Sequence, residues 1–175
     1  DFRNEGVSFK HNTEFTQLEF YWAYADYLKV MELTEQMVSY ACRKVNGSLK
    51  INYQGRELDF TPPWRRLAMC DGILETSGID ITKYPAAESL FLAISAKGMA
   101  PNPQATRGKL IEFLSSEFLE PMLVQPTFLY DYPRDISPLA KSKPGDPLTV
   151  ERFEGYVAGF ELCNAFTELN DPLDQ

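Results

Sequence analysis

The segment from Arg3 to Tyr27 constrains the fold most, because its pattern predicts a β-hairpin with charged groups at its open end. The polar run 10–12, Lys-His-Asn, lies between the two strands. Side chains alternate between the faces of a strand, so one face of the second strand holds Phe15, Gln17, Glu19 and Tyr21, and the other holds Thr16, Leu18, Phe20 and Trp22. We expect the second, mostly apolar face to pack against helices and the first to form the floor of a polar pocket.

Apolar residues at spacings of three and four predict four helices. The clearest runs from an N-cap at Asp26 to a C-cap at Gly47. The others are expected over 67–75, 86–96 and 106–119, and the last ends before Pro121. We interpret the segment 85–121 as a helical insertion that covers a sheet.

Strands are expected in a short hairpin over 48–60, at 126–132, and over 150–169, either as two short strands or as one bent strand. The polar segment 142–147 contains Pro and Gly and predicts a mobile surface loop. Strands, then helices, then strands follow one another without a regular βαβ rhythm. This order favours an α+β fold with a mainly antiparallel sheet flanked by helices.

Length and charge narrow the class of protein further. At 175 residues the chain favours one domain, and a net charge of −8 argues against a surface that coats nucleic acid. The three cysteines form no C-x-x-C pair, which indicates neither zinc nor a disulfide framework. No apolar run approaches 18 residues and no signal peptide is present, so we expect a cytoplasmic protein without a membrane span.

Glu154 and Glu161 are candidate metal ligands, although their spacing leaves two interpretations open. A regular strand would put residues seven apart on opposite faces, whereas a bend or bulge near Gly159 would bring them together. Two adjacent carboxylates would suit Mg²⁺, which prefers oxygen ligands beside substrate phosphates. On spacing alone, solvated surface carboxylates are the more common case.

Three blocks of the chain resemble lysyl-tRNA synthetases of the class II aminoacyl-tRNA synthetase family. Phe-Arg-Asn-Glu-Gly at 2–6, His-Asn-Thr-Glu-Phe-Thr at 11–16 and the run 19–27 ending in Ala-Tyr-Ala-Asp-Tyr are similar to motif 2. The stretches 126–140 and 153–171 are similar to the later blocks that precede motif 3. The resemblance implies that residues 1–175 form an incomplete class II catalytic domain.

The resemblance also implies a role for each matching residue. The ATP-binding set is Arg3, Glu5, His11, Asn12 and Phe15, with Arg3 acting on the α-phosphate and Phe15 stacking on adenine. The lysine-binding set is Glu19, Tyr21, Asn164, Phe166 and Glu168. Glu154 and Glu161 match Mg²⁺ ligands, so ATP and Mg²⁺ are the expected substrate and cofactor.

The function that the resemblance implies is activation of lysine by ATP to lysyl-adenylate and its transfer to tRNA(Lys), within a longer enzyme. Alternatives are a paralogue that lysylates a protein such as elongation factor P, or a non-catalytic domain that binds lysine and ATP. A homodimer is expected when motif 1 is present.

Several features depart from the family pattern. Motif 1, the Gly-rich motif 3 with its arginine, and the anticodon-binding OB-fold do not occur in these 175 residues, and there is no start methionine before Asp1. Phe160 stands where arginine, methionine or leucine is usual, and Gln17 and Trp22 fill positions that are often apolar. We therefore expect these residues to be a portion of a longer protein, and to show weak or no activity by themselves.

Overall fold

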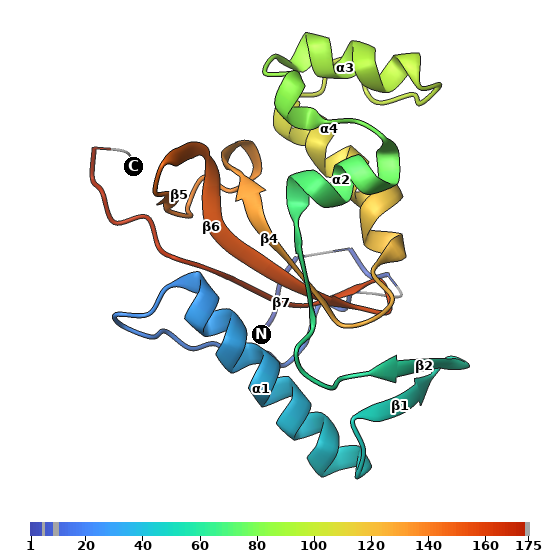
Figure 1. Cartoon of the computed structure of the whole chain (residues 1–175), viewed down its shortest axis with the longest axis vertical. Helices are drawn as coiled ribbons and strands as arrows, with labels where there is room; N and C mark the ends of the chain where they lie inside the picture. Colours follow the sequence, from blue (N-terminus) through green and yellow to red (C-terminus); the bar gives the residue numbers. More distant parts are fainter. Residues whose placement is uncertain (5, 9–10, 174–175) are drawn as a thin grey trace.

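A computed structural model describes residues 1–4, 6–8 and 11–173. Figure 1 shows the shorter helices gathered at one end of the long axis, and the long helix α1 (Tyr27–Asn46) with a small hairpin toward the other. The shorter helices are α2 (Met69–Ser77), α3 (Ala87–Ala96) and α4 (Arg107–Leu114). Single turns of 3₁₀ helix lie at Ile81–Lys83, Glu120–Met122 and Arg134–Ile136, and a π-helical turn at Ser115–Leu119 follows α4 directly. Among the described residues, no helix is both long and apolar enough to cross a bilayer.

Five of the strands in the described residues form one sheet in the order β3-β4-β6-β5, with β7 paired to β6. Its strands are β3 (Arg65–Ala68), β4 (Thr127–Pro133), β5 (Ser142–Lys143), β6 (Asp146–Val157) and β7 (Phe160–Phe166). The pair β3–β4 is parallel, and the other pairs are antiparallel. A separate antiparallel hairpin joins β1 (Lys50–Tyr53) to β2 (Arg56–Asp59). The expected α+β fold with a mainly antiparallel sheet and flanking helices is therefore confirmed.

The two faces of β4 bury against different layers, which explains the helices on both sides of the sheet. Leu129 and Tyr132 pack with α2, α3 and α4, whereas Phe128 packs with Trp64 and with the face of α1 that carries Met31. Both Phe128 and Leu129 are fully buried. This alternation anchors the central strands from which the candidate site is built.

Most predicted elements are confirmed with shifted bounds. Helix α1 has the predicted caps: the Asp26 side chain accepts from the backbone N–H of Lys29, and Gly47 adopts a left-handed conformation. The helix predicted over 67–75 begins later, because β3 occupies the preceding residues. The helix predicted over 106–119 changes to a π-helical turn at Ser115.

Two predictions about the form of segments are wrong. Residues 142–147 belong to β5, to the start of β6 and to the turn between them, so they are not a mobile loop. Residues 15–22 form no strand, and Leu18 and Trp22 are 71% and 51% exposed instead of packing against helices. The alternating pattern in 15–22 lacks a neighbouring strand among the described residues, and without ladder partners the backbone remains extended and solvated.

Candidate functional site

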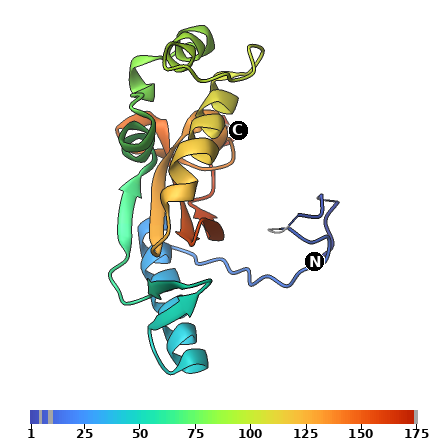
Figure 2. The same cartoon turned by 90° about the vertical axis from the view of Figure 1, so that its right-hand side faces the viewer.

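The N-terminal residues form a hairpin-like arm, as the sequence predicts. Phe2 and Glu14 make an antiparallel bridge, and the backbone N–H of Arg3 donates to the Thr13 carbonyl at 3.1 Å. The Arg3 guanidinium lies 5.5 Å from the centre of the Phe15 ring, so two predicted ATP-binding residues are in contact. Figure 2 shows this arm held away from α1 by an extended segment.

The β6–β7 hairpin brings the two candidate metal ligands to one face of the sheet. Its two-residue turn is Ala158–Gly159, and both residues have positive φ. Gly155 pairs with Cys163 and Tyr156 with Glu161, so β7 carries one extra residue, a bulge at Leu162. Because of this bulge, the residues Glu154, Tyr156, Glu161 and Asn164 share one face. The predicted irregularity therefore lies three residues beyond Gly159.

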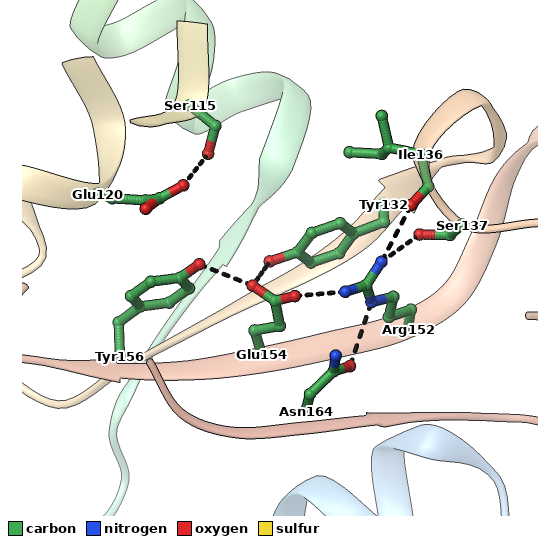
Figure 3. Close-up of polar contacts among 9 residues, drawn as sticks. All are labelled: Ser115, Glu120, Tyr132, Ile136, Ser137, Arg152, Glu154, Tyr156 and Asn164. Carbon is green, nitrogen blue, oxygen red and sulfur yellow. Dashed lines mark hydrogen bonds and ion pairs between the residues drawn. The ribbon is translucent and has the colours of Figure 1, made fainter. Parts of the chain in front are cut away.

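Glu154 is the buried centre of a polar network on this face (Figure 3). Its side chain accepts hydrogen bonds at Oε2 from the hydroxyls of Tyr132 at 2.8 Å and Tyr156 at 2.7 Å. Arg152 forms an ion pair with Oε1. Burial, followed by the charge of Glu154, raises the pKa of both tyrosine hydroxyls well above their usual range, so they remain donors.

Glu161 lies in a different environment from Glu154, although both are on the same face. Glu161 is exposed, but the surrounding protein partly desolvates its carboxyl group. This desolvation, together with the negative charge of Glu154, raises the pKa of Glu161 to about 7. The negative charge of Glu154 thus acts on Glu161 across this face of the sheet, since a like charge disfavours ionisation of a carboxyl group.

Two cavities meet at this hairpin. One, of about 550 Å³, is lined by four arm residues, Arg3, His11, Asn12 and Phe15, and by five others, Glu120, Tyr156, Gly159, Phe160 and Glu161. The second, of about 430 Å³, contains Arg152 and Glu154 and shares Glu120, Tyr156 and Glu161 with the first. Both volumes suit small-molecule ligands. The cavities thus bring the described part of the predicted ATP set together with the predicted metal pair.

The five predicted lysine-binding residues are not gathered in this way. In the described part of the chain none of them lines either cavity. Glu19 lies on the exposed extended segment, where Gln17 donates to it, and Tyr21 is 84% exposed. Phe166 packs against the core of the helical layer, while Glu168 is exposed and its backbone bridges to Ala140. Glu5, from the ATP set, lies outside the described residues.

The donor set fits a hard divalent cation only in part. Among the residues described, no group of three or more His, Cys, Asp or Glu side chains could hold a metal ion. Two carboxylates, Glu154 and Glu161, are nevertheless the number that commonly holds Mg²⁺, with phosphate oxygens and water completing its shell. The chemistry of these residues fits Mg²⁺ bound together with a phosphate ligand.

Sequence reasoning missed Arg152 and the two tyrosines that hold Glu154. Arg152 also donates to Asn164 at 3.2 Å and to the Ser137 hydroxyl at 2.6 Å. The signal that could have revealed it is its place in β6, two residues before Glu154 and therefore on the same strand face.

Comparisons with known proteins agree over the whole chain. The family model of class II tRNA synthetases (D, K and N) matches residues 1–175. The chain is 51% identical over 178 residues to a lysine–tRNA ligase of Clostridium perfringens strain 13, covering 100% of this chain and 36% of that protein. It is 53% identical over 175 residues to a lysine–tRNA ligase of Chloroflexus aurantiacus, again covering 100% of this chain and 36% of the relative. The chain thus spans about a third of the length of these curated relatives, and by the full-length match it belongs to the class II tRNA synthetases of the D, K and N group.

Proposed function

We propose that this chain is part of an enzyme that activates lysine with ATP to lysyl-adenylate and transfers the lysyl group to tRNA(Lys). The observation that carries the proposal is the larger cavity, where an N-terminal arginine and phenylalanine face an acidic residue from the β6–β7 hairpin. The relatives that are about half identical over the full chain are named lysine–tRNA ligases, which supports lysine as the amino acid.

The arm residues are proposed to bind ATP. Arg3 is proposed to stabilise the negative charge that develops at the α-phosphate, and a fixed guanidinium is effective because it needs no reorganisation. Phe15 supplies a flat surface for adenine, while His11 and Asn12 donate or accept hydrogen bonds near the phosphates. Glu5 belongs to the same proposed set.

Glu154 and Glu161 are the two carboxylates that would hold Mg²⁺, which when bound neutralises phosphate charge. The substrate carboxylate is itself the nucleophile, so no side chain needs to act as a general base. His11 is therefore proposed to position ATP and not to transfer a proton.

The lysine site is proposed to form from Glu19 and Tyr21 together with Asn164, Phe166 and Glu168. A lysine ammonium loses its hydration on binding, and this is costly unless carboxylates and neutral polar groups replace the water. Glu19 and Glu168 supply the negative charge. This proposal requires the segment 15–22 to lie against β7 when the site is assembled.

The remaining proposals concern the whole protein. Residues 1–175 are proposed to be one unit of a catalytic domain, with 85–121 as a helical insertion. The complete enzyme is proposed to act in the cytoplasm, without membrane attachment, and as a homodimer through motif 1.

Amino-acid-dependent exchange of pyrophosphate into ATP tests the proposal in the full-length protein. Lysine, aspartate and asparagine are compared, followed by charging of tRNA(Lys). We expect exchange with lysine alone, and a loss of at least a hundredfold in Arg3→Ala, since one such transition-state contact is worth roughly that much. Arg65→Ala is the matched control, because Arg65 pairs at the surface with Glu75 at 2.9 Å. Exchange with aspartate or asparagine, or none at all, would overturn the assignment.

A further inference from the structure

We propose that Arg152 is a positioning residue that fixes the side chains of Glu154 and Asn164 relative to each other. Through them it would set the geometry between the metal-binding carboxylates and the amino-acid site. The functional half of this inference rests on the proposed function, whereas the positioning itself is a property of the fold.

One guanidinium joins residues from both proposed sites. Its Nη2 forms the ion pair with Oε1 of Glu154, and its Nε donates to Oδ1 of Asn164 at 3.2 Å (Figure 3). Glu154 and Asn164 are directly opposite each other on β6 and β7. Arg152 therefore spans a cross-strand pair in which one member is a proposed metal ligand and the other a proposed lysine contact.

The guanidinium is itself held rigidly from a third segment. Its Nη1 donates to the Ile136 carbonyl at 3.1 Å and to the Ser137 hydroxyl at 2.6 Å, in the turn after β4. Its centre lies 4.6 Å from the middle of the Tyr132 ring, and the side chain is only 18% exposed. A side chain fixed at so many points can hold its hydrogen-bond partners in place, because its own rotamer is determined by packing.

The contact with Asn164 also determines which end of the amide is available. A guanidinium donates hydrogen bonds and accepts none. The amide oxygen of Asn164 must therefore face Arg152, and its Nδ2 hydrogens are left for a ligand. The inference predicts that Asn164 acts as a donor to an oxygen atom of its ligand, which for lysine means the carboxylate, and leaves Tyr21 as the neutral group near the ammonium.

Arginine is required for this arrangement, because its planar fork directs donors along several fixed directions. Lysine would keep the positive charge but provide a single flexible ammonium group. Arg152→Lys is therefore the informative variant, whereas an uncharged replacement would leave Glu154 buried without its cation and threaten folding.

The first experiment measures lysine-dependent pyrophosphate exchange in full-length Arg152→Lys, with Arg65→Lys as control. We expect KM for lysine to rise about tenfold to a hundredfold, as is usual when a residue that orients a ligand-binding side chain is lost. The Mg²⁺ concentration for half-maximal activity should rise as well, alongside a lower melting temperature that reflects the hydrogen bonds lost from the guanidinium. A variant that only melts earlier, with KM and Mg²⁺ dependence unaltered, would assign Arg152 a purely structural role and overturn the proposal.

A double-mutant cycle separates positioning from a direct effect. If Arg152 acts on lysine through Asn164, the change in KM caused by Arg152→Lys should largely disappear in an Asn164→Ala background. If the fold-changes in KM of the two single variants multiply in the double variant, the residues act independently, and the inference is contradicted.

A crystal structure of the Arg152→Lys variant judges the positioning without any assay of activity. Rotation of the Asn164 or Glu154 side chain supports it, and unchanged side chains overturn it. If the unmodified protein shows no lysine-dependent exchange, the proposed function fails. The crystal structure of the Arg152→Lys variant then still tests whether Arg152 positions Glu154 and Asn164.

Discussion

At the residue scale, the candidate site depends on one carboxylate being held in a largely buried position. Glu154 is 8% exposed, and two hydroxyls and a guanidinium replace the water that it loses. A hydrogen bond to a charged group contributes about 1.5–3 kcal/mol. The network therefore fixes the carboxylate in place and links β4 to β6, because Tyr132 comes from β4.

Tyr132→Phe should lower the free energy of unfolding by about 2 kcal/mol, because it removes one charge-assisted hydrogen bond and leaves the Glu154 oxygen with fewer donors. Urea denaturation measures the change. Tyr53→Phe is the control, since the Tyr53 side chain is exposed and its hydroxyl accepts a hydrogen bond from the Gln54 amide at 3.4 Å. Equal losses in the two variants would show that the contact with Glu154 contributes nothing.

Cys70 gives a pH-dependent test at the same scale. Burial, followed by the nearby charge of Asp71, raises the pKa of the Cys70 thiol to about 11. Because the thiolate is the reactive form, alkylation of Cys70 by iodoacetamide at pH 8 should be about a hundredfold slower than in the urea-unfolded chain, and its rate should keep rising with pH up to about 11. Mass spectrometry of the Cys70 peptide follows the reaction. Equal rates in native and unfolded chains would contradict the environment described for this thiol.

At the element scale, the β6–β7 turn should respond to substitution in opposite directions. Ala158 and Gly159 have φ of 53° and 77°, the geometry of a two-residue hairpin turn that favours Asn-Gly. Ala158→Asn should stabilise the chain by about 0.5–1 kcal/mol, whereas Gly159→Ala should destabilise it by about 1 kcal/mol through backbone strain. Thermal unfolding of both variants checks the signs. Stabilisation by Gly159→Ala, or destabilisation by Ala158→Asn, would rule out this turn geometry.

The elements that the sequence predicts well are those whose signals are local. Helix α1 is an example, since Asp26, an apolar stripe and Gly47 mark its start, face and end within one segment. The bulge at Leu162 is different, because it depends on how β7 pairs with β6 and no residue type marks its place. The strand predicted at 15–22 fails for a related reason, since alternation of side chains forms a strand only where another strand supplies backbone partners.

At the scale of the whole molecule, the sequence predicts the candidate site only through the residues that match motif 2 and the later blocks of the family. Four of the five predicted ATP-binding residues line one cavity with Glu161, although Glu161 lies more than a hundred residues further along the chain. The spacing of two from Glu154 places Arg152 on the same strand face, but its importance arises from contacts with β7 and with the turn after β4, which the sequence does not show. The lysine-binding set remains a prediction: Glu19 and Tyr21 lie on the extended segment without regular structure, whereas Asn164 and Phe166 belong to β7.

The exposed segment 16–25 should be the first part of the chain that a protease cleaves. Residues 16–25 have no regular secondary structure, and Tyr21 and Tyr24 are 84% and 103% exposed. Chymotrypsin cleaves after aromatic residues in accessible, extended backbone, and local stability is lowest where few contacts are buried. Limited digestion of the 175-residue chain should therefore first release the N-terminal arm and leave a fragment that begins near Ala23 or Ala25, while Phe128 and Phe153 in the sheet stay protected. Mass spectrometry of the early fragments measures this order. Early cleavage at Phe128 or Phe153, with the arm still attached, would show that residues 16–25 are not the most accessible part of the chain.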